Sequence, residues 1–236
     1  MPVNAVRDGG LPQGEAKTRA VRAMFDTISP RYDLVNRVMT FGLDRSWRRA
    51  GVRSLGLLAG SRVLDVACGT GDLCRDLLRA GYDPVGVDLS SGMLSHARTT
   101  APLVHTDALQ LPLASASVDG AVSGFALRNF VALPPLFGEL ARVVRPTGRI
   151  ALLDVATPTN PVLRAGHAVY FGHVVPRIGA VLSDRDAYRY LPKSVAYLPP
   201  TGELLDSLVA AGFHAVERRL LAGGIAQLIT ATRSRP

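Results

Sequence analysis

The sequence predicts an α/β fold in which a largely parallel β-sheet carries helices on both faces. Short apolar runs alternate with segments of helical periodicity between Arg62 and Val155. A glycine-rich turn joins the first apolar run to the helical segment that follows it. The last two apolar runs, 214–220 and 224–232, have no helix between them. We therefore expect a parallel sheet whose final pair of strands is antiparallel.

The N-terminal segment is expected to be helical and to lie outside the sheet. Residues 1–16 are rich in Gly, Pro and polar residues without periodicity, which favours a mobile arm. Apolar residues recur at helical spacing over 17–57, and Ser29-Pro30 is expected to separate two helices there. We expect one domain over 17–236, with 17–57 as a helical lid and 58–236 as a Rossmann-like core.

The elements of the core follow in order along the chain. The expected strands are 63–66, 84–88, 103–105, 118–125, 149–155, 214–220 and 224–232. Helical segments follow the first, second and fourth of these strands, and two more are expected at 161–182 and 204–211. The stretch 161–182 is mostly apolar and uncharged, so it is expected either to pack in the core or to line a channel for an apolar substrate.

Composition excludes several classes of protein. No stretch approaches the roughly 18 consecutive apolar residues of a membrane span, and no apolar segment typical of a signal peptide follows Met1. Cys68 and Cys74 are the two cysteines, which excludes a disulfide scaffold and fits a reducing compartment. We therefore predict a cytoplasmic protein.

The chain is basic, with a net charge of +8, and the N-terminal quarter contributes most of the excess. Such an excess indicates an anionic partner, unless it reflects the arginine-rich codon usage of a GC-rich genome. No RNA-binding module is recognisable, so we predict no nucleic-acid partner. The N-terminal arginines are interleaved with Phe25, Phe41 and Trp47, which predicts peripheral contact with an anionic membrane surface.

The glycine-rich turn predicts a site for S-adenosyl-L-methionine. Gly69 and Gly71 follow the first strand, and Asp88 ends the next strand 17 residues after Gly71, close to the spacing at which an acid meets ribose hydroxyls. A dinucleotide site would have a third small residue where Cys74 stands. Asp65 precedes the glycines, and an acid there suits a cationic sulfonium ligand better than a pyrophosphate. Asp107, after the third strand, is placed to accept a hydrogen bond from the adenine amino group.

Several motifs now point to one family. The first begins at Met24-Phe25-Asp26 and continues through Ser29, Tyr32-Asp33, Asn36, Met39-Thr40, Gly42, Arg45 and Trp47-Arg48. The second is Phe125-Ala126-Leu127-Arg128-Asn129, and others lie at 142–149, 173–179, 187–191 and 223–225. From about Arg22 onward the chain resembles the ubiquinone/menaquinone biosynthesis C-methyltransferase family, of which demethylmenaquinone methyltransferase is a member.

This resemblance implies the class I S-adenosylmethionine-dependent methyltransferase fold, with a seven-stranded sheet. It implies methyl transfer to a ring carbon of a polyprenylated quinol, with demethylmenaquinol favoured and the ubiquinone-pathway benzoquinol as the alternative. Ala126 in place of a glycine, and the loss of a C-terminal histidine, leave open a relative that acts on another phenolic or polyketide ring. The family's donor-site positions correspond to Thr70, Asp88, Asp107 and Ala108. A donor-site serine of the family falls at Gly124, and the adjoining Ser123 is the residue expected to contribute to the donor site.

Arg128 and Asn129 are the predicted catalytic residues. Methylation of a quinol carbon requires a reduced ring that loses a phenolic proton. Arg128, expected at the carboxyl end of the fourth strand, would lower the pKa of that phenol, and Asn129 would orient its hydroxyl or a water. The resemblance implies that the pair serves the acceptor. The alternative for Asn129 is a cap on the following helix.

Further candidates are expected to contact the substrate. Tyr32, Asp33 and Asn36 lie at helical spacing and would close over the donor or form a buried polar network. His173, like His167, is a candidate proton acceptor because histidine titrates near neutral pH. Tyr188 belongs to the tyrosine-rich motif 187–191. We expect no metal site, and a homodimer is left open.

Overall fold

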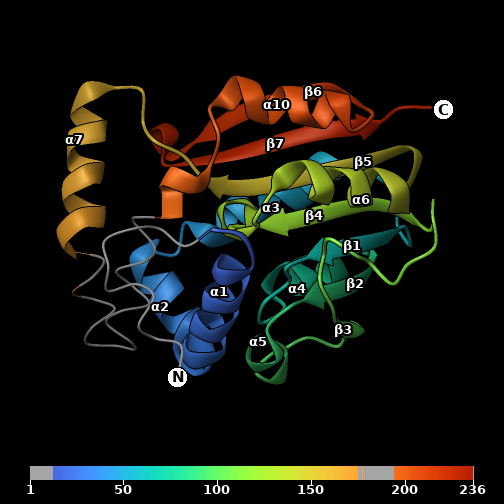
Figure 1. Ribbon diagram of the computed structural model, residues 1–236, viewed down its shortest axis with the longest axis horizontal. Helices are drawn as coiled ribbons and strands as arrows, with labels where there is room; N and C mark the ends of the chain where they lie inside the picture. Colours follow the sequence, from blue (N-terminus) through green and yellow to red (C-terminus); the bar gives the residue numbers. More distant parts are fainter. Residues whose placement is uncertain (1–12, 175–176, 178–193, 236) are drawn as a thin grey trace.

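The sheet expected from the sequence is present in the computed structural model, which describes residues 13–174, 177 and 194–235 (Figure 1). Its strands lie in the order β3-β2-β1-β4-β5-β7-β6. Their bounds are β1 Arg62–Val66, β2 Asp83–Asp88, β3 Leu103–His105, β4 Val118–Gly124, β5 Val144–Val155, β6 Phe213–Leu221 and β7 Ala226–Arg233. Strands β1 to β5 are parallel to one another, whereas β7 is antiparallel to both β5 and β6. The antiparallel end of the sheet is therefore confirmed.

The helices occupy the segments between the strands. Their bounds are α1 Gly14–Ile28, α2 Tyr32–Met39, α3 Asp44–Leu55, α4 Asp72–Arg79, α5 Ser91–Ser95, α6 Leu133–Val143, α7 Pro161–Val169 and α10 Thr201–Ala210. Shorter turns of helix are η2 Ser29–Arg31, η3 Leu127–Asn129, η4 Tyr170–Val174, η5 Val195–Tyr197 and η6 Ala222–Gly224. The expected break at Ser29-Pro30 is confirmed as η2. Residues 14–16, expected in the arm, are helical instead, and residues 1–12 of that arm lie outside the described part.

Two hydrophobic cores cover the two faces of the sheet. On one face α6 and α10 pack on the sheet, and Phe137 and Phe213 are fully buried there. On the other face α3 and α4 pack on the sheet, with Leu55 and Leu77 fully buried. Because the central strands are covered on both sides, their apolar residues point to both faces of the sheet.

The expected lid divides into two parts. Helix α3 packs against β4, β5 and β7, so residues 44–55 belong to the core and the expectation of a lid over 17–57 was too wide. Helices α1 and α2 instead pack against α5, where Ile28 and Val35 bury Met93. Asp26 Oδ1 also accepts hydrogen bonds from Ser90 Oγ (2.6 Å) and Gly92 N (2.9 Å). These contacts hold α1 and α2 over the carboxyl ends of the parallel strands (Figure 1).

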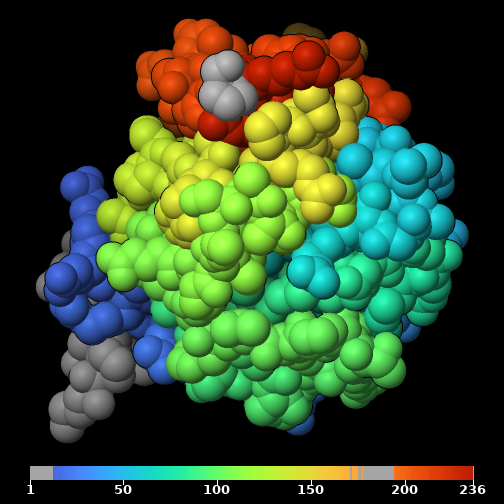
Figure 2. All heavy atoms as spheres, turned by 90° about the vertical axis from the view of Figure 1, so that its right-hand side faces the viewer, coloured from blue at the N-terminus to red at the C-terminus, as the bar shows by residue number. Residues whose placement is uncertain are grey.

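The two ends of the sheet differ in what covers them. Helices α1, α2 and α7 gather at the carboxyl ends of the parallel strands (Figure 1). The opposite end is closed by turns, and the N-terminal helices appear only at its margin (Figure 2). This asymmetry leaves the carboxyl edge as the place for a site.

The apolar stretch 161–182 is described as far as Val174, together with Arg177. Helix α7 buries none of its residues, so packing in the core does not explain its apolar character. Among the described residues, no helix is both long enough and apolar enough to cross a lipid bilayer.

Candidate active site

The glycine-rich turn passes from β1 into α4 through left-handed backbone. Gly69 and Gly71 have φ angles of 55° and 79°. At Gly71 a Cβ atom would also lie 2.7 Å from Thr99 Cγ2, so a larger residue is excluded by space as well as by backbone strain. The amide of Gly69 donates a hydrogen bond to Asp88 Oδ2 (2.8 Å), which fixes the turn against the end of β2.

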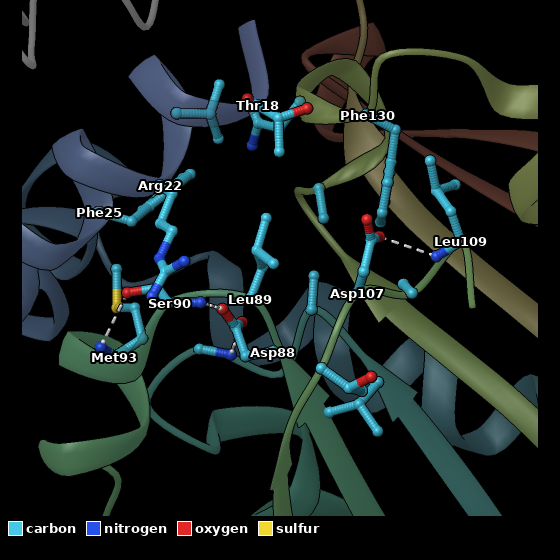
Figure 3. Close-up of a pocket in the computed structure, with 18 of the residues that line it drawn as sticks. Thr18, Arg22, Phe25, Asp88, Leu89, Ser90, Met93, Asp107, Leu109 and Phe130 are labelled. Atoms are coloured by element: carbon cyan, nitrogen blue, oxygen red, sulfur yellow. Dashed lines mark hydrogen bonds between the residues drawn. The ribbon is translucent and has the colours of Figure 1, made fainter. Parts of the chain in front are cut away.

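A pocket opens between this turn and α1, and we call it the loop pocket (Figure 3). Side chains of α1 form one wall, and the ends of β2 and β3 with the segment after β4 form the others. Figure 3 shows Arg22 and Phe25 on one side and Asp107, Leu109 and Phe130 on the opposite side. The lining residues are Thr18, Val21, Arg22, Phe25, Tyr32, Ala67, Gly69, Val87, Asp88, Leu89, Ser90, Met93, Thr106, Asp107, Ala108, Leu109, Gly124, Phe125, Ala126, Asn129, Phe130 and Val131.

Four of the predicted donor-site residues line this pocket: Gly69, Asp88, Asp107 and Ala108. Asp88 Oδ1 accepts a hydrogen bond from Ser90 N (2.8 Å), and Asp107 Oδ1 accepts one from Leu109 N (2.9 Å). Burial raises the pKa of Asp88 above its ordinary value. The two carboxylates therefore have fixed orientations in the pocket wall, at the ends of successive strands.

Asp65 and Ser123 do not line the pocket, contrary to expectation. Asp65 is fully buried beneath the turn, where its Oδ2 accepts a hydrogen bond from Cys74 Sγ (3.2 Å). Burial raises the pKa of Asp65 to about 7. Ser123 Oγ donates to Val66 O (2.8 Å) within the sheet, whereas Gly124 lines the pocket. Successive side chains of a strand point to opposite faces, so Ser123 does not replace a side chain at position 124.

Thr70 and Gly71 also lie outside the lining. Thr70 Oγ1 donates a hydrogen bond to Asp33 Oδ1 (2.5 Å), which ties the turn to α2. Gly71 is the residue before α4. For Asp33 the structure therefore favours the polar network that connects the lid to the core, because this residue lines neither cavity of the site.

A second cavity lies on the other side of Tyr32 and Phe125, and we call it the apolar cavity. It encloses about 350 Å³, against about 110 Å³ for the loop pocket. Its walls come from α2, α3, α7 and the segment after β4, and most of them are apolar. The lining residues are Tyr32, Asn36, Met39, Thr40, Phe41, Leu43, Trp47, Phe125, Arg128, Val155, Val162, Leu163, Gly166, His167, Tyr170, Val195 and Ile225.

Tyr32 and Phe125 line both cavities and form the partition between them. Phe125 has a φ of 61°, a strained value for a bulky residue. Its amide donates to Leu153 O (2.6 Å), and its ring centroid lies 6.1 Å from that of Trp47. Burial raises the pKa of Tyr32, so this phenol is neutral at physiological pH.

The turn η3 directs the predicted catalytic pair to different cavities. Arg128 lines the apolar cavity and Asn129 lines the loop pocket. Arg128 is buried and forms an ion pair with the fully buried Asp154. Its Nε donates to Ser194 Oγ (3.1 Å) and its Nη1 to Phe125 O (2.7 Å). Within the described residues, Nη2 is the guanidinium nitrogen without a hydrogen-bond partner.

Asn129 does not cap the following helix. Helix α6 has Ala132 at its N-cap and no side-chain cap hydrogen bond, so the capping alternative is wrong. The Oδ1 atom of Asn129 is buried and has no hydrogen-bond partner among the described residues. An orphaned acceptor at the edge of a pocket points to a bound group or water that would satisfy it.

The remaining substrate candidates have separate outcomes. Asn36 lines the apolar cavity, as does His167, whose pKa is lowered by burial. His173 is exposed on η4 and lines neither cavity, so its position does not support contact with an acceptor. Tyr188 lies outside the described residues. In the described part of the chain, no group of three or more His, Cys, Asp or Glu could hold a metal ion.

Sequence reasoning missed one wall of the loop pocket. Thr18, Val21, Arg22 and Phe25 all line it from α1. Their spacing of three, one and three residues places them on one face of a helix, which was a usable signal. Arg22 and Thr18 were missed because they are polar, and the apolar pattern alone was followed.

Comparison with known proteins agrees along almost the whole chain. The model of the ubiE/COQ5 methyltransferase family matches residues 13–233. The ubiquinone/menaquinone biosynthesis C-methyltransferase UbiE of Syntrophotalea carbinolica is 42% identical over 224 residues, which covers 91% of this chain and 94% of that protein. The demethylmenaquinone methyltransferase of Roseiflexus castenholzii is 40% identical over 228 residues, which covers 93% of this chain and 96% of that protein.

Solved structures with lower identity share the fold. A SAM-dependent methyltransferase of Thermotoga maritima, a possible histamine N-methyltransferase by its title, has a TM-score of 0.64 at 17% identity and covers 91% of this chain and 100% of its own. Haemonchus contortus phosphoethanolamine N-methyltransferase 2, in complex with S-adenosyl-L-methionine, has a TM-score of 0.60 at 15% identity and covers 80% of this chain and 52% of its own. The class I methyltransferase fold expected from the sequence is confirmed.

Proposed function

Because the chain belongs to the ubiE/COQ5 methyltransferase family, we propose that it methylates a ring carbon of a polyprenylated quinol, converting demethylmenaquinol to menaquinol. The methyl donor is S-adenosyl-L-methionine. The observation that carries the proposal is that a pocket with two carboxylates in its wall, those of Asp88 and Asp107, lies beside a larger apolar cavity. The two share Tyr32 and Phe125 as a common wall. A water-soluble methyl donor and an apolar acceptor require two adjacent binding sites of this kind.

The residues of the loop pocket fit the donor. Asp88 uses each carboxylate oxygen once for a backbone amide, which leaves lone pairs for the two ribose hydroxyls. Asp107 stands where it would accept from the adenine amino group, with Leu109 and Phe130 as apolar neighbours. When bound, the donor supplies an electrophilic methyl group from its sulfonium. Asn129 Oδ1, which is orphaned at the pocket edge, would accept a hydrogen bond from a donor group, the acceptor hydroxyl or a water.

The residues of the apolar cavity fit a quinol ring with an isoprenoid tail. Trp47, Phe125 and Tyr170 offer aromatic walls for the ring, and the mouth is apolar. Arg128 would stabilise the phenolate through Nη2, because its other nitrogens are committed to Asp154, Phe125 O and Ser194. The Asp154 carboxylate fixes the guanidinium plane, so its orientation needs no reorganisation during the reaction. Tyr32 and Phe125 would exclude water from the reacting atoms.

A comparison of acceptors tests this proposal. The enzyme is incubated with labelled donor and with reduced demethylmenaquinone, the ubiquinone-pathway benzoquinol or a simple phenol, and kcat/KM is measured for each. We expect the highest value for demethylmenaquinol. A higher kcat/KM for the benzoquinol or for the phenol would show that this compound, and not demethylmenaquinol, is the preferred acceptor. If neither quinol becomes labelled, the proposal is overturned.

We also propose that the mouth of the apolar cavity rests on an anionic membrane surface. Phe41 and Val162 line the cavity and yet are 78% and 79% exposed. The exposed charged side chains of α2, of the start of α3 and of α7 are all arginines: Arg37, Arg45 and Arg164. An apolar rim with basic neighbours is the pattern of a peripheral membrane contact. The predicted membrane-facing aromatics need correction, because Trp47 is buried and Phe25 lines the loop pocket.

Sedimentation with vesicles tests the membrane contact. We expect the protein to pellet with phosphatidylglycerol vesicles at low ionic strength and to be released at high ionic strength. The double variant F41S/V162S should pellet less. The control L58S removes a side chain that is 84% exposed but lies before β1, at the opposite edge of the sheet, and should pellet like the wild type. Wild-type protein that stays in the supernatant at low ionic strength would refute this contact.

A further inference from the structure

Lys17 is a buried lysine near the start of α1. It is only 3% exposed, although lysine is among the residues least often buried without a partner. Its Nζ donates a hydrogen bond to Phe130 O (2.6 Å) and lies 3.6 Å from the centroid of the Tyr197 ring. A carbonyl and an aromatic face therefore hold the ammonium where a carboxylate would be usual.

The two partners of Lys17 lie on segments that contribute to the walls of the two cavities. Phe130 lines the loop pocket and follows Asn129 in the chain. Tyr197 is the last residue of η5, whose first residue, Val195, lines the apolar cavity. Ser194, which precedes η5, accepts the hydrogen bond from Arg128 Nε. A single side chain from α1 thus contacts the segments that position both predicted catalytic residues.

We propose that Lys17 is a positioning residue that fastens α1 over the loop pocket and connects this closure to the η3 and η5 segments. Thr18, Val21, Arg22 and Phe25 of α1 form one wall of the pocket. In this proposal the donor enters with α1 displaced, and displacement breaks both contacts of Lys17. The inference rests on the proposed function for the identity of the donor.

The fastening has a defined dependence on pH. Burial lowers the pKa of Lys17 to about 8, whereas the ordinary value of 10.5 applies once α1 is displaced. The ionisable group that faces Lys17 is Tyr197, whose pKa is raised by burial. Ser194, which precedes the same segment, contacts Arg128, and Arg128 is paired with Asp154. On α1 itself, Glu15 and Arg19 are exposed and paired with each other. The raised pKa of Tyr197 keeps its phenol neutral between about pH 7 and 9.5.

The direction of this pH dependence follows from the lowered pKa of Lys17. The fastened state binds the proton more weakly, so fastening releases a proton between pH 8 and pH 10.5. Closure, and with it donor binding, therefore becomes more favourable as the pH rises above about 8, by up to about tenfold per pH unit. Below about pH 8 Lys17 is protonated in both states, and its contribution does not vary with pH.

Calorimetry of donor binding tests this proposal on the full chain. The dissociation constant of S-adenosyl-L-methionine is measured at about pH 7 and 9.5 for the wild type and for K17M. Because the amino group of the donor also titrates in this range, the quantity compared is the ratio of the two proteins' constants. We expect this ratio to shift by at least about tenfold in favour of the wild type at the higher pH. Buffers of different ionisation enthalpy should reveal proton release in the wild type that is absent from K17M.

Two further variants keep the test decisive. K17R carries a guanidinium that does not lose its proton in this range, so it should lack the wild-type pH dependence even if K17M folds poorly. R19M removes an exposed cation from the same helix and should follow the wild type. Wild-type pH dependence in K17M or in K17R would overturn the role of Lys17 alone. A wild-type protein that does not bind the donor would overturn the proposed function as well.

Discussion

Arg128 combines a buried charge with one guanidinium nitrogen that has no hydrogen-bond partner among the described residues. Its ion pair with Asp154 compensates the positive charge, so its value to the reaction lies in orientation more than in net charge. The planar fork of arginine makes three different contacts here, which a lysine amine does not reproduce.

Replacement of Arg128 by lysine should therefore lower kcat by about 10²–10³-fold, the usual loss for an oriented donor to a developing oxyanion. Donor affinity should stay within a few-fold, because Arg128 does not line the loop pocket. Steady-state turnover of demethylmenaquinol and calorimetry of donor binding measure the two effects. A kcat near that of the wild type would show that Arg128 does not stabilise the acceptor.

Asp65 gives the protein a measurable pH dependence of stability. Its pKa of about 7 in the folded chain lies above the ordinary value of 3.8, so the folded state binds a proton more tightly than the unfolded state between these values. The Asp65 contribution to stability therefore falls as the pH rises from about 4 to 7, by up to about 1.4 kcal/mol per unit.

The D65N variant, which does not titrate, should gain stability relative to the wild type over this range. Urea unfolding at about pH 5 and pH 7 measures the difference between the two proteins. An equal difference at both pH values would contradict the assignment of this pKa to Asp65.

At the residue scale, the sequence could predict Asp88 and Asp107, because an acid at the end of a parallel strand reaches the carboxyl edge whatever packs around it. It could not predict the position of Asp65 or Ser123. Both lie inside strands, where a shift of one residue moves a side chain to the other face. Asp65 contacts Cys74, and Ser123 contacts Val66. These contacts form only in the folded chain, so the local sequence pattern does not predict them.

At the element scale, a buried cluster of charges joins α3 to α4. Arg48 forms ion pairs with Asp44, Asp72 and Asp76, and its side chain is 9% exposed. Removal of the cation would leave the buried Asp44 carboxylate without an ion pair in the described part of the chain, and Asp76 with only the exposed Arg79. R48M should therefore lose about 3–5 kcal/mol of unfolding free energy.

Chemical denaturation measures this loss, and the adjacent exposed arginine provides a matched control. R49M should stay within about 0.5 kcal/mol of the wild type, as surface substitutions usually do. Equal stability of R48M and R49M would show that the cluster does not hold the two helices together.

The boundaries of most elements followed from the apolar runs and from Ser29-Pro30. The sequence did not predict which element packs against each helix. Helices α1 and α3 both have an amphipathic pattern, yet α3 packs on the sheet and α1 packs on α5 and on the turn after β4. Periodicity identifies the apolar face of a helix, but its partner depends on contacts that are distant in the sequence. The same limit applies to α7, whose apolar residues are exposed at a cavity mouth.

At the scale of the whole molecule, two compartments meet at the carboxyl edge of the sheet. The net charge of +8 includes the arginines beside the cavity mouth. The partition of Tyr32 and Phe125 is the point at which a donor methyl and an acceptor carbon would meet. The proposed reaction therefore requires methyl transfer between these two compartments.

Transfer of an isotopically labelled methyl group tests this claim most directly. The wild-type protein is incubated with methyl-labelled S-adenosyl-L-methionine and with demethylmenaquinone in its reduced or its oxidised form, and the labelled position is found by NMR. The account predicts label on a ring carbon of the quinol, and only with the reduced form, because only that ring can become an electron-rich phenolate. Absence of label from the reduced quinol, or equal labelling of the oxidised quinone, would contradict it.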